Sequence, residues 1–360
     1  MSKDKPTILV AVSGGVDSSV VAAMLAEQGY PVIGVMMHLW SEAGKECENK
    51  CCTPQSMEEA RKSAQTIGYP FHVIDAAETF RKQIVQYFLD GYGQGKTPNP
   101  CVICNRDIKW GLLFDKVSDF GADYLATGHY VRLAKDKNEK IRVLKAKDSQ
   151  KDQSYVMSML QQSQLQKTLF PLGEYLKPEV RDIARKYGLP MAEKKDSQDL
   201  CFVSDDNYRD FLLRNAPEIA VPGSIMDRFG NKLGDHQGLA FYTIGQRKGI
   251  RLSASEPLYV LEKNAKDNVL VVGSVDDLNQ NAILVKDVNW ISAETPQNEI
   301  KSDVKIRYKA DYVRATVFPI ENQKVRIEFD KPVRDATPGQ FAVFYNDDEL
   351  LGGGEIEMSI

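Results

Sequence analysis

Short apolar runs alternate with amphipathic stretches through the first half of the chain. The apolar runs at 7–12, 32–37, 71–74 and 124–126 have the length of buried strands. Helical spacing predicts helices at 18–28, 57–67, 78–89, 106–120, 154–160 and 178–187. Strands and helices in alternation predict an α/β fold with a parallel sheet covered on both faces. In such sheets, ligands bind beyond the carboxyl ends of the strands.

The pattern changes near residue 205. Glycine and proline become frequent between 222 and 249, which favours a small β-rich domain. Alternating runs at 282–285, 304–308, 315–318, 324–329 and 340–345 then predict a small barrel or sandwich. We therefore expect an α/β domain at 1–205, a central β-rich domain at 206–279 and a C-terminal β-barrel at 280–360.

Composition limits the class of protein. With 42% hydrophobic and 27% charged residues, the chain has the make-up of a soluble globular protein, and 360 residues predict two or three domains. It contains no apolar run of the ~20 residues that a membrane helix needs, so the cytoplasm is the expected compartment. The net charge of −4 shows no overall basic character, but a local basic stripe is enough to bind RNA.

A glycine-rich loop follows the first predicted strand. Residues 13–18 read Ser-Gly-Gly-Val-Asp-Ser and lead into the first predicted helix. Glycines allow close approach of the backbone to a phosphate, and amides at a helix N-terminus point at it. The loop lacks the lysine of a Walker A motif, and Asp17 is placed to hold Mg²⁺ against phosphate oxygens. The alternative is an ordinary glycine turn with polar helix caps.

The cysteines are the second chemical feature, at positions 47, 51, 52, 101, 104 and 201. Cys101 and Cys104 form a Cys-x-x-Cys pair just before a predicted helix, whose N-terminus is expected to lower a thiol pKa. Lys194 and Lys195 would favour a thiolate at Cys201, for which an inert packed thiol is the alternative. The first three cysteines stay unassigned, because their spacing is a poor match to zinc sites.

Nine strings together resemble those of the tRNA-specific 2-thiouridylases (MnmA/TrmU family), which belong to the N-type ATP pyrophosphatases with a PP-loop. The resemblance runs nearly end to end, in the family's order, through 13–19, 97–105, 126–130, 151–155, 200–202, 236–238, 245–249, 337–340 and 351–354. It implies that ATP, with Mg²⁺, adenylates the 2-carbonyl oxygen of the wobble uridine (position 34) of tRNA. A cysteine persulfide then delivers sulfur, which gives 2-thiouridine, AMP and pyrophosphate.

The resemblance also implies roles for individual residues. Cys104 matches the nucleophile and Cys201 the persulfide carrier, and the two form a disulfide during turnover that a partner reduces. Matches to the family's ATP contacts are Ala11, Val12, Ser13, Gly14, Gly15, Val16, Asp17, Ser18, Met37 and Gly128. The implied partners are tRNAs for Lys, Glu and Gln, and a sulfur donor such as a cysteine desulfurase or a sulfur-relay protein.

Two further sets match RNA-facing positions of the family. Asn99, Pro100 and Cys101 correspond to the element that faces the target base. The tRNA contacts correspond to His129, Lys151, Asp152, Gln153, Arg307, Tyr308 and Gln340. Alternation on the strand predicted at 304–308 would place three cations on one face, beside an aromatic suited to base stacking. Surface turns and a solvated barrel face are the alternatives.

One departure from the family opens an alternative mechanism. Many members have Asp where this chain has Cys101, so Cys101, Cys104 and Cys201 could converge on a [4Fe–4S] cluster with one open iron. Iron-dependent tRNA thiolation therefore remains beside the persulfide route. Other rivals are a different PP-loop amidotransferase or ligase, and a non-enzymatic RNA-binding scaffold with a relic loop.

Overall fold

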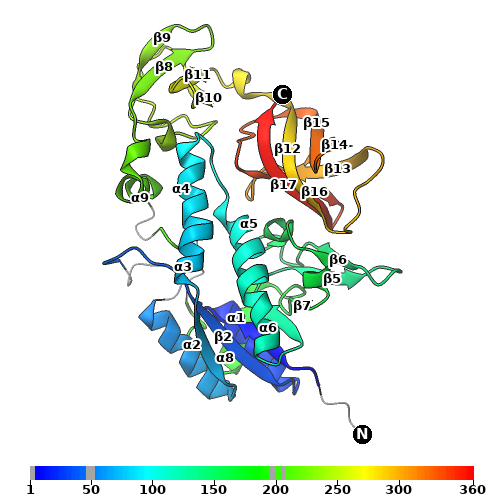
Figure 1. Cartoon of the computed structure of the whole chain (residues 1–360). Coiled ribbons are helices and arrows are strands. Elements are labelled where there is room, and N and C mark those ends of the chain that lie inside the picture. Colours follow the sequence, from blue (N-terminus) through cyan, green and yellow to red (C-terminus); the bar gives the residue numbers. More distant parts are fainter. Residues whose placement is uncertain (1–4, 46–52, 195–199, 204–206) are drawn as a thin grey trace.

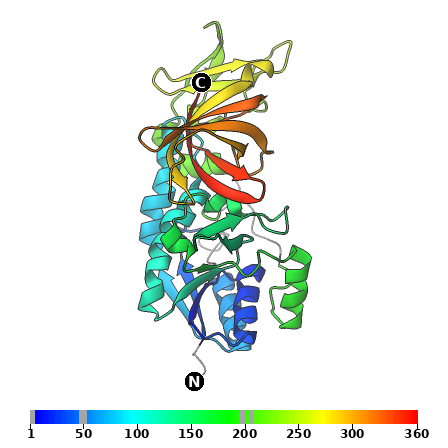
Figure 2. The ribbon, with the colours of Figure 1, turned by 90° about the vertical axis from the view of Figure 1, so that its right-hand side faces the viewer.

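Three bodies follow one another along the chain in the computed structural model, which describes residues 5–45, 53–194, 200–203 and 207–360 (Figure 1). The N-terminal α/β body lies at one end of an elongated molecule, and the central β-rich body and the C-terminal barrel lie at the other (Figure 2). The cysteines at 47, 51 and 52 are outside the described residues. Within those residues, no helix has the length and apolarity needed to cross a bilayer.

A five-stranded sheet forms the centre of the N-terminal body. Its order is β3 (Phe71–Asp75), β2 (Val32–His38), β1 (Ile8–Ala11), β4 (Tyr124–Thr127) and β7 (Thr168–Leu169). Every neighbouring pair is parallel, as the alternation of strands and helices predicts. The carboxyl ends of β1, β2 and β4 therefore meet at one edge of the sheet.

Helices cover both faces of this sheet. Ile8 and Val10 of β1 belong to a core shared with α1 (Val16–Glu27), α2 (Pro54–Ile67) and α8 (Lys177–Lys186). Leu9 points to the opposite core, because successive strand residues face opposite ways. That second core includes side chains from two long helical stretches: α3 (Ala77–Phe80), η1 (Arg81–Val85) and α4 (Gln86–Gly93), then α5 (Pro100–Cys104), η2 (Asn105–Leu113) and α6 (Phe114–Asp119).

The second long helix begins earlier than the sequence predicts. Pro100 occupies its first turn, and the Asn99 side chain caps it by accepting from the Val102 amide at 3.4 Å. Pro suits the first helical position and Asn the N-cap. The Cys101/Cys104 pair therefore lies inside the helix, not before it.

Shorter elements complete the N-terminal body: β5 (Arg132–Lys135), β6 (Ile141–Leu144), η3 (Ser154–Met157) and α7 (Gln162–Leu165). The helix predicted at 154–160 is only the single 3₁₀ turn η3. Nearly every side chain of that segment is buried, so contacts on all sides hold it in place of an amphipathic helix. One of them is the hydrogen bond from Tyr155 Oη to Phe341 O, at 2.8 Å, which reaches the barrel.

The central body is a small four-stranded sheet in the order β10 (Tyr259–Asn264), β11 (Val269–Gly273), β8 (Gly223–Asp227) and β9 (Lys232–His236). Its helices are α9 (Tyr208–Asn215) and the 3₁₀ turns η4 (Pro217–Ile219), η5 (Leu239–Phe241) and η6 (Asp276–Leu278). Ile225, Val260, Leu270 and Val272 fill its own apolar core. The structure confirms the β-rich character predicted for this region.

Six strands close the C-terminal barrel: β12 (Gln280–Trp290), β13 (Ile300–Lys305), β14 (Val313–Ile320), β15 (Lys324–Val333), β16 (Phe341–Asn346) and β17 (Glu349–Ser359). The order β12-β15-β14-β13-β16-β17 is closed by pairing of β17 with β12. The predicted barrel is confirmed. Strand β6 of the N-terminal body also pairs with β17, so the β5–β6 hairpin extends the barrel sheet.

One predicted barrel strand ends early. The strand expected at 304–308 stops at Lys305, because the chain turns there and the Ala310 amide bonds to Arg307 O at 3.1 Å. Arg307 and Tyr308 therefore lie in the β13–β14 loop, and the predicted three-cation strand face does not form. Gln340 likewise precedes β16, which begins at Phe341.

Candidate functional site

The predicted ATP contacts gather at the carboxyl edge of the parallel sheet. Ala11 pairs with Val35 on one side and Thr127 on the other. Met37 lies two residues beyond Val35, and Gly128 directly follows Thr127. The structure thus brings the loop at 12–18, Met37 and Gly128 together at the place where parallel sheets bind ligands.

The loop is shaped as an anion cradle. Gly14 has a φ of 71°, and a Cβ there would meet the backbone of α2 at 2.2 Å. A Cβ on Gly128 would lie 2.8 Å from Ser18 N. Gly15 is the N-cap of α1 and offers no side-chain acceptor to the first helical amides. Ser19 Oγ is buried without a partner in the described protein. Open amides, an orphan hydroxyl and close backbone packing suit phosphate oxygens.

Asp17 forms an ion pair that the sequence does not reveal. Lys177, at the start of α8, donates to Asp17 Oδ1 at 2.7 Å and to Oδ2 at 2.8 Å. Tyr130 Oη donates to Oδ1 at 2.8 Å. Both carboxylate oxygens are therefore occupied by protein donors. A magnesium ion at Asp17 would have to compete with Lys177 for this carboxylate, and we derive no step through the metal.

Cys101 and Cys104 sit on the first turns of the second long helix. Cys101 is exposed and Cys104 half-buried. Burial among surrounding protein atoms raises the pKa of the Cys101 thiol, and the nearby Lys109 charge only partly opposes this. The thiol pKa of Cys101 is therefore raised, against the lowering predicted from the helix N-terminus, and desolvation is the main cause.

Cys201 lies near the same apolar core as Cys104. Both half-buried thiols pack against one cluster, and the Phe202 ring lies against Phe80 and Phe88 at centroid distances of 5.8 and 5.3 Å. Lys194, predicted to act on Cys201, instead donates to Glu59 and to Gly14 O. Lys195 is outside the described residues.

The iron–sulfur alternative requires three thiols in one place. Within the described ranges, no three His, Cys, Asp or Glu side chains are grouped to hold a metal ion, and this includes the thiols at 101, 104 and 201. An open-iron cluster needs three converging protein ligands. The described residues thus give no support to such a cluster, and no reaction step is assigned to iron.

His129 is neutral and held from three sides. The Lys109 ammonium can only donate, so its contact with Nε2 at 3.1 Å makes that nitrogen an acceptor. The proton is then on Nδ1, which donates to Thr127 Oγ1 at 2.8 Å. Burial, and then the Lys109 charge, lower the pKa of His129 well below 6.5. Trp110 and Phe170 flank the ring at 5.6 and 6.2 Å.

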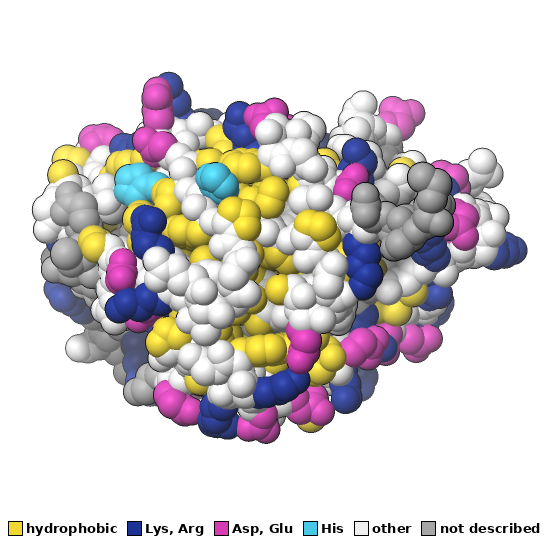
Figure 3. Space-filling view, turned by 90° about the horizontal axis from the view of Figure 1, so that it is seen from below, with side chains coloured by type: hydrophobic (Ala, Val, Ile, Leu, Met, Phe, Trp, Pro, Cys, Tyr) yellow, Lys and Arg dark blue, Asp and Glu magenta, His cyan; other side chains and the backbone are white. Residues whose placement is uncertain are grey.

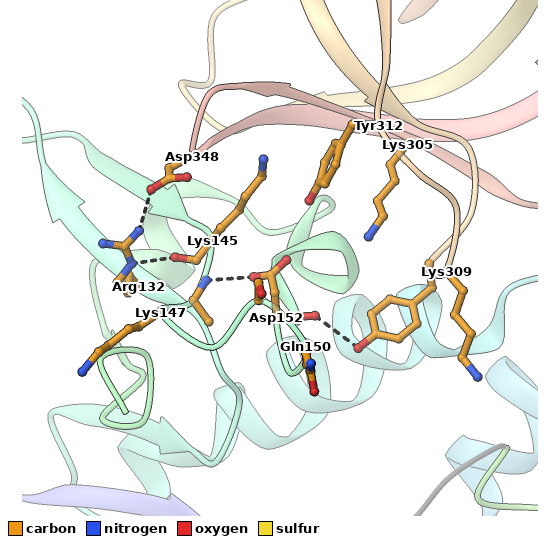
Figure 4. Close-up of a pocket in the computed structure, with 12 residues that line it drawn as sticks. Arg132, Lys145, Lys147, Gln150, Asp152, Lys305, Lys309, Tyr312 and Asp348 are labelled. Carbon is orange, nitrogen blue, oxygen red and sulfur yellow. Dashed lines mark hydrogen bonds and ion pairs between the residues drawn. The ribbon is translucent and has the colours of Figure 1, made fainter. Parts of the chain in front are cut away.

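Two predicted RNA-contacting segments, distant in sequence, meet at the junction of the N-terminal body and the barrel. Tyr308 Oη donates to Asp152 O at 3.1 Å, and its ring packs on Tyr155 at 5.9 Å. A cleft of about 730 Å³ lies between them, as Figure 4 shows. Its lining is rich in basic and aromatic side chains: Arg132, Lys145, Ala146, Lys147, Ser149, Gln150, Asp152, Lys305, Tyr308, Lys309, Tyr312 and Asp348.

Several residues predicted to contact RNA form hydrogen bonds or ion pairs within the protein. The Asp152 carboxylate accepts from the Ala146 amide at 2.9 Å and from Ser154 Oγ at 2.8 Å. Gln153 exchanges hydrogen bonds with Tyr130, whose amide donates to Gln153 Oε1 at 3.0 Å. The segment at 151–153 therefore links the phosphate-loop edge to the cleft, while Arg307 pairs with Asp335 at 3.6 Å.

Gln340 contacts the segment that leads into the cysteine helix. Its Nε2 donates to Thr97 O at 2.9 Å, and the Thr97 amide donates to Pro338 O at 2.9 Å. Lys263 of the central body donates to Lys96 O at 3.2 Å. The barrel and the central body thus both hold the residues just before Asn99.

The face at the N-terminal end differs from the cleft. Figure 3 shows hydrophobic side chains in its centre and charged ones mostly around its margin. RNA phosphates are bound by cations, so the cleft is the better candidate for an RNA interface.

Comparison with known families gives a consistent assignment. Three family models match the chain: a tRNA methyl transferase HUP domain over residues 6–205, a tRNA methyl transferase PRC-barrel domain over 209–274 and an aminomethyltransferase β-barrel domain over 280–356. A solved 4-thiouridine synthetase–RNA complex with bound ATP covers 59% of this chain and 51% of its own, at 16% identity and a TM-score of 0.36. That likeness is too low to add to the assignment.

Full-length relatives are much closer. The tRNA-specific 2-thiouridylase MnmA of Natranaerobius thermophilus is 45% identical over 356 residues, which cover 97% of this chain and 96% of the relative. The MnmA protein of Clostridium perfringens is 41% identical over 355 residues, which cover 98% and 99%. Such identity over whole chains shows the family: the chain belongs to the tRNA-specific 2-thiouridylases of the MnmA type.

Proposed function

We propose that this chain is an ATP-dependent tRNA sulfurtransferase that converts the wobble uridine to 2-thiouridine. The observation that carries the proposal is the anion cradle of Gly14, Gly128 and the α1 amides in the same body as the thiols of Cys104 and Cys201. A cradle without a Walker lysine suits attack at the α-phosphorus, and two thiols suit sulfur transfer. The family assignment supports both parts.

The first step activates the base. The uridine O2 attacks the α-phosphorus of ATP, the bond to pyrophosphate breaks, and an O-adenylated uridine forms. The amides of the loop at 13–18 and the start of α1 stabilise the charge that develops on the phosphate oxygens. Asn99, Pro100 and Cys101 face the target base in this proposal.

The second step transfers sulfur. The terminal sulfur of a Cys201 persulfide attacks C2, and AMP leaves with the C–O bond electrons. The Cys104 thiolate then attacks the inner Cys201 sulfur, so the S–S electron pair stays on the sulfur now bound to C2. The products are 2-thiouridine and a Cys104–Cys201 disulfide. A two-electron thiol reductant restores the cysteines, and a sulfur-donor protein reloads Cys201.

We propose that RNA binds at the junction of the N-terminal body and the barrel. There Lys151, Arg307 and Tyr308 would contact tRNA at the cleft, and His129 and Gln153 would contact it deeper in the N-terminal body. The substrates proposed are tRNAs for Lys, Glu and Gln. Gln340, expected to contact tRNA, would act on it indirectly, because its amide holds Thr97 O next to the element that faces the target base.

Reconstitution with tRNA, ATP and a persulfide donor tests the proposal. Nucleoside mass spectrometry should find 2-thiouridine with wild type and none with Cys104→Ser or Cys201→Ser, while Cys101→Ser should stay active. The same spectra separate sulfur substitution from the methylation that two of the family-model descriptions name, because the mass increments differ. A methylated or unchanged uridine with wild type would refute the proposal.

A further inference from the structure

The cleft has an excess of basic side chains, although the whole chain carries a net charge of −4. Arg132, Lys145, Lys147, Lys305 and Lys309 line it, against only Asp152 and Asp348. Asp348 accepts from Arg132 at 2.9 Å, and backbone and hydroxyl donors occupy the Asp152 carboxylate. The acids are therefore already engaged by their neighbours.

Lysines on opposite walls of the cleft converge on one aromatic ring. Lys145 Nζ lies 3.9 Å from the centre of the Tyr312 ring, and Lys305 Nζ lies 4.9 Å from the same centre. Figure 4 shows Lys145 reaching up from the N-terminal body, while Lys305 and Tyr312 extend from the barrel. Among the described residues, no carboxylate forms an ion pair with Lys145, Lys305 or Lys309.

In this grouping, the positive charges of Lys145 and Lys305 are not neutralised by an ion pair with any described residue. Burial lowers the pKa of Lys305, the Asp152 and Asp311 charges oppose this in part, and the nearby Lys145 charge adds to the lowering. The face of an aromatic ring attracts cations but compensates only a small part of two ammonium charges. An anion placed between these lysines would relieve their repulsion, and the ring holds both side chains ready for it.

The position of the cleft indicates which anion. Tyr308 lines the cleft, and its ring packs on Tyr155 of η3 at 5.9 Å. The η3 turn in turn contacts α5, the helix that carries Cys101. A strand of RNA with its target base at Cys101 would pass its neighbouring phosphates through the cleft.

We propose that Lys145 and Lys305, held against Tyr312, bind the phosphodiester backbone of tRNA beside the target nucleotide. The identity of the RNA rests on the proposed function, but the phosphate chemistry does not. Because both bodies contribute to the contact, tRNA would bind at full strength only when the barrel and the N-terminal body hold their relative positions.

Salt dependence of tRNA binding tests the proposal. Each phosphate contact with a single strand contributes about 0.7 to the slope of log affinity against log salt, so Lys145→Gln/Lys305→Gln should lower the slope by about 1.4. Affinity at moderate salt should fall on the order of tenfold. The KM for ATP should stay near wild type, because neither lysine touches the phosphate loop.

Two matched variants complete the design. Lys266→Gln/Lys331→Gln removes the same charge from exposed lysines outside the cleft and should leave slope and affinity near wild type. Lys145→Arg/Lys305→Arg keeps the charges and should keep the slope, which separates charge from misfolding. A slope unchanged in the cleft Gln variant, or lowered equally in the control, would overturn the proposal. If wild type makes no 2-thiouridine while the cleft Gln variant still lowers the salt slope of tRNA binding, only the proposed reaction is refuted.

Discussion

Lys177 and Asp17 are the clearest pair of residues whose roles emerge only in three dimensions. The two side chains, 9% and 31% exposed, form a two-pronged ion pair 160 residues apart, beside the phosphate loop. Removal of one partner of a largely buried pair leaves the other charge uncompensated and typically costs about 3–5 kcal/mol. The Asp17 exposure places the expected loss at the lower end of this range.

Lys177→Met should therefore destabilise the protein and raise the KM for ATP. Urea unfolding measures the first effect and initial-rate kinetics the second. A double-mutant cycle with Asp17→Asn isolates the pair, because two contacting residues couple and distant ones do not. Strictly additive losses in the cycle would show that the ion pair does not stabilise the loop. Lys186→Met, at an exposed pair on the same helix, serves as the control.

His129 makes stability depend on pH. Its folded pKa is depressed by burial and by Lys109, so the unfolded chain binds a proton before the folded one does as pH falls below 6.5. The contribution of neutral His129 to the free energy of unfolding is then fully present above pH 6.5. It decreases below pH 6.5, by at most about 1.4 kcal/mol per pH unit. Burial lowers the pKa of His236 as well, which adds a pH dependence of the same sign.

Urea unfolding at pH 7.5, 6.5 and 5.5 would measure this slope. His129→Gln should flatten it between pH 6.5 and 5.5, while His72→Gln, at an exposed ring, should reproduce the wild-type curve. Equal slopes in wild type and His129→Gln would contradict a neutral, buried His129.

Among the elements, the segment at 95–99 determines where the cysteine helix begins. Gln340 holds Thr97 O, and Gly339 leaves no room for a side chain, since a Cβ there would meet Thr97 at 3.1 Å. Gln340→Ala should lower kcat several-fold through looser placement of α5, with little change in the KM for tRNA. A direct RNA contact would instead raise that KM. Gln340→Glu removes the donor and should behave like Gln340→Ala.

Elements were predictable from sequence where local pattern decides them. The strands and helices around the phosphate loop follow from apolar periodicity and from the glycines at 29 and 68. The end of β13 does not, because Lys305 to Lys309 keeps an alternating pattern through a turn that tertiary contacts of Tyr308 hold in place. The 3₁₀ turn at Tyr155 was missed for the same reason.

At the scale of the whole molecule, the order of the three bodies was predictable from the sequence, but the contacts between them were not. Residue types indicate a parallel sheet and a barrel, yet nothing in them shows that β6 pairs with β17. Lys177, Lys109 and Tyr130 were likewise hidden, since a partner far along the chain has no sequence signature. The glycine loop and the cysteines were visible because their chemistry is local.

The N-terminal body and the barrel share one apolar core. The cluster around Trp110 and Tyr155 continues into Phe341, Val343 and Tyr345 of β16. Two bodies joined by a common core and a continuous sheet should unfold together, because exposure of one half of the core destabilises the other. We therefore expect a single unfolding transition for both.

Tryptophan fluorescence can report on each body separately. The chain has only three tryptophans, so Trp40→Phe/Trp290→Phe leaves Trp110 in the N-terminal body and Trp40→Phe/Trp110→Phe leaves Trp290 in the barrel. In each variant, the fluorescence transition should coincide with the far-ultraviolet circular dichroism transition. If Trp290 reported an earlier transition than the circular dichroism of the same variant, the barrel would unfold independently. Tyr155→Phe leaves Phe341 O without its donor and should lower both transitions together, because the lost hydrogen bond lies in the core that the two bodies share.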